Sequence, residues 1–161
     1  MIHRQEGQNL LEFALLSVVL FMILLGIMGF SLIFAAHLSL NLAVNTAGRA
    51  AAVEDWTLAP ETGYDQIIYD ELVGSLIILD PQSVQSIIIY RPNADGTIGS
   101  MKNVLDGSGN LLSEGYDKAE RSRDTFIGVQ VTYLQAVIVP FVSEVTGPNM
   151  QITKSATFRI E

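Results

Sequence analysis

The sequence predicts an α+β protein in which one long N-terminal helix crosses a membrane, continues beyond it as a stalk, and leads into a small antiparallel-sheet domain. Three observations support this prediction. Residues 13–36 contain no charged side chain, and neither proline nor a cluster of glycines interrupts residues 10–53. Two later segments, 125–133 and 150–160, largely alternate apolar and polar residues with the period of two that strands have.

Residues 13–36 are long enough to span a bilayer. As a helix, these 24 residues rise about 36 Å, whereas the hydrocarbon core of a bilayer is about 30 Å thick. A cleavable secretory signal has a shorter apolar region, of about 7–15 residues. Basic residues precede the span at His3 and Arg4, and acidic residues follow the stalk at Glu54 and Asp55, which predicts a cytoplasmic N-terminus. An uncleaved membrane anchor fits both observations.

Glu12 is the residue that a simple anchor leaves unexplained. A carboxylate at the mouth of an apolar helix is disfavoured unless it is solvated or paired. Cleavage between Gly7 and Gln8 would give Gln8 a free amine, four residues before Glu12 and on the same face of the helix. In a bundle of such helices an unpaired charge is costly. If the amine of Gln8 in one subunit paired with the Glu12 carboxylate of a neighbour, the pairing would fix the axial register of the two subunits.

Residues 7–15, with the sequence Gly-Gln-Asn-Leu-Leu-Glu-Phe-Ala-Leu, resemble the cleavage-and-helix motif of type IV pilins and pseudopilins, and most closely that of TadE-like proteins of tight-adherence systems. Residues 45–53 are similar to the small-residue helix end of this family, including its arginine at Arg49, and residues 155–161 resemble its last strand. The leader departs from a lysine-rich one, because it has a single arginine and also Glu6. Residues 54–124 resemble the family only loosely.

The resemblance implies a pilin-like organisation with a leader peptide at 1–7, a transmembrane and stalk helix at 8–53 and an extracytoplasmic α+β domain at 54–161. It implies cleavage after Gly7 by a membrane prepilin peptidase. Assembly into a homo-oligomeric extracellular filament would use Glu12 and Phe13, together with an assembly ATPase and a membrane platform. The chain would lie in the cytoplasmic membrane before assembly and at the cell surface afterwards.

Two alternatives to a filament subunit remain open at this point. One is an uncleaved bitopic membrane protein whose outer domain binds a partner. The other is a minor pseudopilin that only initiates or tips a filament. The processed N-terminus and the abundance of the subunit in purified filaments distinguish these possibilities.

The outer part of the predicted stalk carries a polar stripe. Its four residues recur at intervals of four and therefore lie along one side of a helix: His37, Asn41, Asn45 and Arg49. Alanines on the other faces keep the helix slim, which allows helices to approach closely. The stripe fits a seam between neighbouring stalks, and it equally fits a solvated helix face.

Beyond the stalk the sequence predicts a connector, a helix and a sheet. Trp56 and Pro60 lie in the connector. An apolar stripe at helical spacing then predicts a helix that docks on the stalk or on the sheet, with the members Tyr64, Ile67, Ile68, Leu72 and Leu76. Residues 86–90 are expected to form a strand with two apolar faces, and turns are expected at 93–96 and 106–110. Three or four antiparallel strands are expected in all.

Composition argues against several functional classes. The net charge is −8, and the acids lie almost wholly after residue 53, which disfavours nucleic acid as a partner. The chain has no cysteine, so disulfides, thiolate chemistry and cysteine-based metal sites are impossible. His3 and His37 are its two histidines, which leaves the outer domain without the histidine that a catalytic triad or a zinc cluster needs. We therefore expect neither an enzyme nor a cofactor or metal site.

Overall fold

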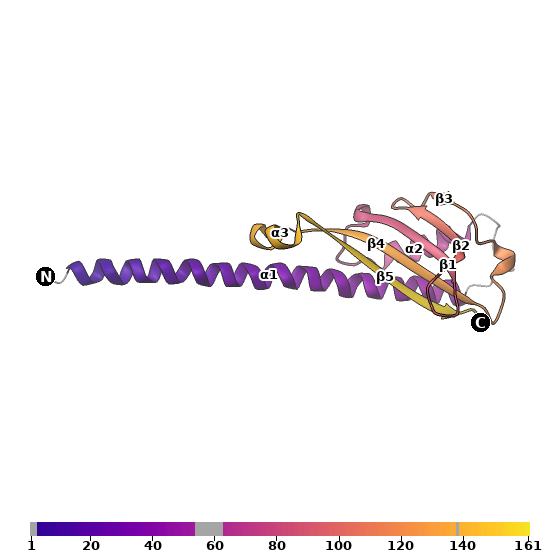
Figure 1. The fold of residues 1–161 in the computed structure, drawn as a ribbon, viewed down its shortest axis with the longest axis horizontal. Helices are drawn as coiled ribbons and strands as arrows, with labels where there is room; N and C mark the ends of the chain where they lie inside the picture. Colours follow the sequence, from indigo (N-terminus) through magenta and orange to yellow (C-terminus); the bar gives the residue numbers. More distant parts are fainter. Residues whose placement is uncertain (1–2, 54–62, 138) are drawn as a thin grey trace.

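The computed structural model describes residues 3–53, 63–137 and 139–161 (Figure 1). The predicted connector with Trp56 and Pro60, and the acidic residues Glu54 and Asp55, lie outside the described residues. The elements follow one another in the order α1 (His3–Val53), α2 (Tyr64–Gly74), η1 (Pro81–Ser83), β1 (Val84–Pro92), β2 (Ile98–Asp106), β3 (Leu111–Ser113), η2 (Lys118–Glu120), β4 (Phe126–Ala136), α3 (Pro140–Thr146) and β5 (Asn149–Arg159).

The long N-terminal helix is confirmed. Helix α1 has 51 residues and is therefore about 76 Å long, and its N-terminal part projects far beyond the rest of the chain (Figure 1). Within the part of the chain that the structure describes, α1 is the one helix long and apolar enough to cross a membrane. It runs without a break from His3 through Gly7, so the boundary between leader and mature chain stays a prediction.

The outer domain contains one antiparallel sheet with the strand order β3-β2-β1-β4-β5. Strands β4 and β5 pair in continuous register from Phe126 opposite Arg159 to Ala136 opposite Asn149. The α+β fold class is thus confirmed, but the sheet has five strands and the expectation of three or four was wrong. Strand β2 was missed because Gly99, Lys102 and Asn103 interrupt its apolar pattern, and β3 is only three residues long.

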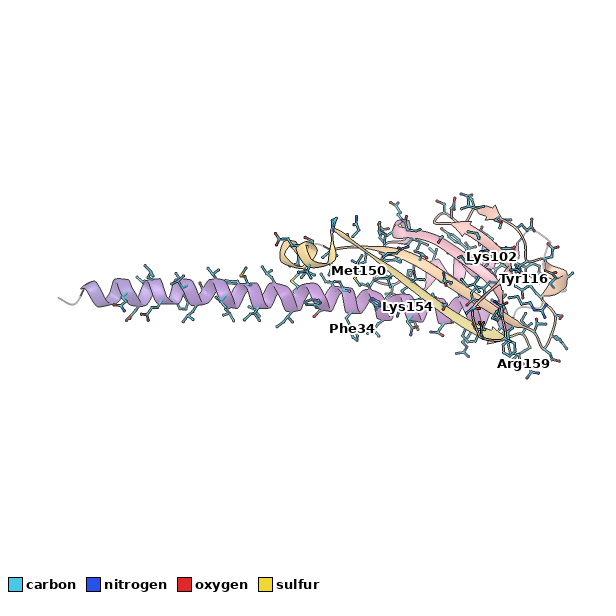
Figure 2. The ribbon with its side chains drawn as sticks, in the orientation of Figure 1. Phe34, Lys102, Tyr116, Met150, Lys154 and Arg159 are labelled. Atoms are coloured by element: carbon cyan, nitrogen blue, oxygen red, sulfur yellow. The ribbon has the colours of Figure 1, made fainter. Side chains whose placement is uncertain are left out.

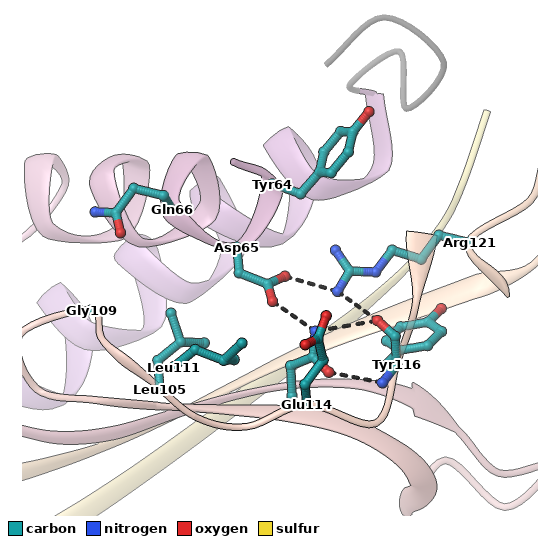
Figure 3. Close-up of a pocket in the computed structure, with 10 residues that line it drawn as sticks. Tyr64, Asp65, Gln66, Leu105, Gly109, Leu111, Glu114, Tyr116 and Arg121 are labelled. Carbon is teal, nitrogen blue, oxygen red and sulfur yellow. Dashed lines mark hydrogen bonds and ion pairs between the residues drawn. The ribbon is translucent and has the colours of Figure 1, made fainter. Parts of the chain in front are cut away.

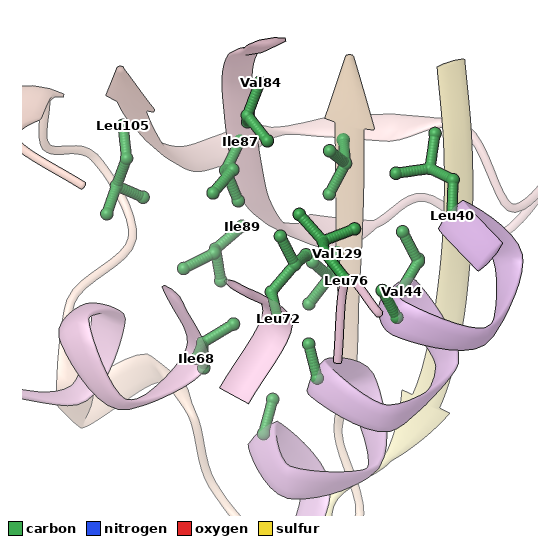
Figure 4. Packing of buried hydrophobic residues seen from close by; sticks show 14 of the residues in the cluster. Leu40, Val44, Ile68, Leu72, Leu76, Val84, Ile87, Ile89, Leu105 and Val129 are labelled. Carbon is green, nitrogen blue, oxygen red and sulfur yellow. The ribbon is translucent and has the colours of Figure 1, made fainter. Parts of the chain in front are cut away.

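The core of the domain lies between the sheet and the two helices α1 and α2 (Figure 4). Both ends of the predicted α2 stripe are buried, but Ile67 is 37% exposed. The buried members are spaced by four residues, whereas Ile67 is turned to one side of that row. The outer half of α1 contributes residues that are at most 2% exposed and belong to the same cluster: Ala36, Leu40, Ala43, Val44, Ala47 and Ala51.

Small side chains on α1 allow this close packing. A Cβ atom placed on Gly48 would lie 2.5 Å from Cε2 of Phe158 in β5, which is closer than non-bonded carbon atoms approach. The backbone N–H of Glu161 also donates to the carbonyl oxygen of Ala52 at 3.1 Å. The C-terminal strand is thereby held against the end of the stalk, so the stalk is part of the domain and not a tether to it.

Helix α3 is an element that the sequence did not predict. It joins β4 to β5 and lies beside α1, beyond the end of the sheet that faces the N-terminus (Figure 1). Val139 and Val142 are 6% and 2% exposed. A Cβ atom on Gly29 would lie 3.0 Å from Cγ2 of Val142 and 3.1 Å from Cγ2 of Val139. The absence of a side chain at Gly29 therefore lets this segment pack directly on α1.

Candidate functional site: the free end of the N-terminal helix

The predicted processing and assembly residues lie at the end of α1 that is remote from the domain. Residues 8–28 are exposed, apart from Ser17 and Gly26, which are partly exposed. Side chains project from both sides of this part of α1 (Figure 2), and Leu10 and Phe13 are 70% and 71% exposed. Apolar surface costs about 25 cal/mol per Å² when it faces water. This surface therefore needs lipid or other helices to cover it.

Glu12 accepts a hydrogen bond from a partner that the sequence argument did not foresee. The side-chain amide Nε2 of Gln8 donates to Oε1 of Glu12 at 3.2 Å. In the uncut helix the backbone nitrogen of Gln8 is a neutral amide, so the side chain of Gln8 is the group that reaches the carboxylate. The spacing of four between glutamine and glutamate was the sequence signal for this contact.

The polar stripe lies on a side of α1 that faces away from the core. Asn41 and Arg49 are exposed, and His37 and Asn45 are partly exposed. Nδ2 of Asn45 donates to the carbonyl oxygen of Asn41 at 2.7 Å. Beside the stripe, two leucines are also more than half exposed: Leu38 and Leu42. The outer stalk thus presents a mixed apolar and polar surface, and the seam between stalks stays a prediction.

A small cavity of about 150 Å³ lies between α2, β2 and the segment 114–121 (Figure 3). Nη2 of Arg121 donates to Oδ1 of Asp65 at 2.8 Å, and Nδ2 of Asn103 donates to Oδ2 of Asp65 at 2.7 Å. Oδ1 of Asn103 accepts the backbone N–H groups of Gly115 and Tyr116, each at 2.8 Å. These polar groups are engaged with one another, and the network joins α2, β2 and the segment 114–121.

The charge of Arg121 has a second role in this network. Its guanidinium carbon lies 4.8 Å from the centroid of the Tyr116 ring, a distance at which a cation is attracted to the ring face. Burial raises the pKa of Tyr116, and the positive charge of Arg121 acts in the opposite direction.

In the described residues no group of three histidine, cysteine, aspartate or glutamate side chains is placed to hold a metal ion.

The fold and the exposed helix define a class of protein, namely an α+β protein whose long apolar helix supports membrane association. Residues 7–49 match the family model described as TadE-like protein. The match includes Gly7, Gln8, Glu12 and Phe13, and it confirms the resemblance to TadE-like proteins and supports a component associated with a Tad pilus. Neither a search of curated proteins nor a search of solved structures gives a match.

We predict that Asp65→Ala destabilises the outer domain by about 3 kcal/mol, because removing one partner of a buried ion pair leaves the other charge without compensation. Asp65 and Arg121 are the partners, with side chains 17% and 2% exposed. The matched control is Asp70→Ala on the same helix, where the carboxylate is exposed and accepts a bond from Gln66. Urea unfolding of both variants gives the difference, and equal midpoints would contradict a stabilising role for the pair.

Proposed function

We propose that the chain is a pilin or pseudopilin, a structural subunit of a type IV or Tad-like extracellular filament, processed after Gly7 and assembled through α1. One observation carries the proposal. The helix with the TadE-like motif leaves residues 8–28 uncovered by the rest of the described chain. Lipid covers such a surface in the membrane, and the same helices of other copies cover it in a filament.

The pairing of Glu12 explains how register is set in this proposal. Cleavage converts the neutral backbone nitrogen of Gln8 into a charged amine. Within a helical bundle, water no longer solvates the Glu12 carboxylate, and an unmatched buried charge costs several kcal/mol. The Gln8 amine of a neighbouring subunit removes that cost when it lies beside the Glu12 carboxylate. The favoured axial positions of two subunits are therefore those that bring these two charges together.

The outer stalk supports the same proposal. Leu38 and Leu42 are 56% and 55% exposed, and they lie next to the stripe formed by His37, Asn41, Asn45 and Arg49. A neighbouring stalk that packs here would bury the leucines and leave the amides to form hydrogen bonds across the seam. The predicted seam between stalks is therefore part of the proposal.

The proposal assigns the chain a structural role and no catalytic one. Its partners would be further copies of the chain, a prepilin peptidase, an assembly ATPase and a membrane platform, as the family resemblance implies. Before assembly the subunit would lie in the cytoplasmic membrane with its N-terminus inside, and afterwards in a filament at the cell surface. An uncleaved bitopic protein and a minor filament-initiating pseudopilin are the alternatives.

We predict that the mature protein begins at Gln8. Intact mass and N-terminal sequencing of subunits from purified surface filaments measure this directly, and Gly7→Val is expected to leave the longer precursor in the membrane. Material that begins at Met1 or Ile2 would point to the uncleaved bitopic protein. Normal filaments from Gly7→Val would place the cleavage site elsewhere, and a trace of this chain among another major subunit would indicate the minor pseudopilin.

We predict that Glu12→Ala inserts into the membrane at least as well as the wild type, because it removes a charge from the end of an apolar helix. It should nevertheless lose most of its filament yield, because the amine of Gln8 then lacks its counter-charge. Gln8→Ala is the matched control, since it removes the side-chain bond to Glu12 but keeps the backbone amine. Membrane level and filament yield are measured side by side. Wild-type yield from Glu12→Ala, or equal losses in both variants, would contradict pairing through the amine.

A further inference from the structure

We propose that α3, together with Val139 directly before it, is a membrane-interface element that contacts the phospholipids of the outer leaflet while the subunit is still in the membrane. The occupant is lipid, from the headgroups to the upper acyl chains. This inference goes beyond the proposed function and takes from it only that α1 spans a bilayer with its N-terminus on the cytoplasmic side. It holds or fails independently of processing and filament assembly.

The height of α3 along α1 is the first argument. Val139 and Val142 pack over Gly29, and Gly29 is the first fully buried residue after the exposed stretch 8–28. That stretch of 21 residues rises about 32 Å, close to the roughly 30 Å of a bilayer core. The rest of the chain thus begins to cover α1 at the height where the hydrocarbon of the bilayer ends.

The placement of α3 near the outer surface of the bilayer holds for two choices of membrane boundary. About 20 helical residues fill the hydrocarbon core. If the core begins at Gln8, its outer boundary lies near Ile27, about 3 Å before Gly29. If the core ends at Ala36, the last residue of the uncharged stretch, Gly29 lies about 10 Å inside it. In both cases α3 lies within the zone of headgroups and upper acyl chains.

The composition of the segment fits that zone. Glu144 is the one charged residue between Thr125 and Thr153. Val142 is buried against α1, whereas Glu144 is exposed and Val145 is 79% exposed. An apolar side chain next to a single carboxylate suits an element that lies about 5–10 Å into the boundary between headgroups and acyl chains. The charge disfavours deeper immersion.

The absence of cysteine from the chain permits a clean test with single labels. Val145→Cys carries an environment-sensitive fluorophore in the full-length subunit, reconstituted in vesicles of phosphatidylcholine and phosphatidylglycerol. Quenching is measured with lipids spin-labelled near the headgroup and with iodide in the buffer. The matched control is Leu112→Cys in β3, where the side chain is 66% exposed.

We expect the label at position 145 to be quenched several-fold more strongly by the lipid nitroxide than the label at position 112, and to be protected from iodide. Equal responses at the two positions would overturn the proposal. Protection of position 145 from both quenchers would also overturn it, because a second copy of the chain and not lipid would then cover α3.

A second pair of variants tests the contact that sets the height. Gly29→Leu places a side chain against Val139 and Val142, while a Cβ atom at Gly26 meets nothing within 4 Å. In the Val145→Cys background, we expect Gly29→Leu to change the ratio of lipid to iodide quenching by several-fold and Gly26→Leu to leave it unchanged. Unchanged quenching in Gly29→Leu, or equal changes in both variants, would overturn the proposal that packing on Gly29 holds α3 in the interface.

Discussion

The fold depends on one helix that serves two environments. From Gln8 to Met28 the side chains of α1 are uncovered by the described chain, whereas from Gly29 onward one face of the same helix is built into the domain. Because an α-helix satisfies its own backbone hydrogen bonds, it passes from lipid to a protein core without a break. The height of the domain above the membrane is then fixed by where the packing begins.

Residue size decides where each part of the domain meets α1. Gly29 admits the valines before and within α3, and Gly48 admits the ring of Phe158. Between them, small buried residues such as Ala43 and Ala47 let α2 and the sheet approach the helix backbone. Larger side chains on the opposite side, among them Leu38 and Leu42, stay exposed. The division of α1 into a packed face and a free face is therefore a division by side-chain volume as well as by polarity.

The sequence predicted the features that depend on local pattern. The long helix follows from an uncharged stretch without helix breakers, and the α2 stripe and the alternation of β4 and β5 follow from periodicity. The spacing of Gly7 and Glu12 is also visible without a structure. Features made by distant contacts were missed. Asp65 and Arg121 are 56 positions apart, and nothing local marks them as partners. The position of α3 over Gly29 depends on the length of the β4–β5 pair, which the alternating pattern alone does not fix.

The outer part of α1 belongs to the core of the domain. Comparing the thermal unfolding of two soluble fragments, 35–161 and 54–161, tests this most directly. Burying a side chain such as Leu40 or Val44 is worth about 1.5–3 kcal/mol, and several such residues approach a typical stability of about 5–15 kcal/mol. We predict a cooperative transition for 35–161 and none for 54–161. Equal melting midpoints for the two fragments would contradict it.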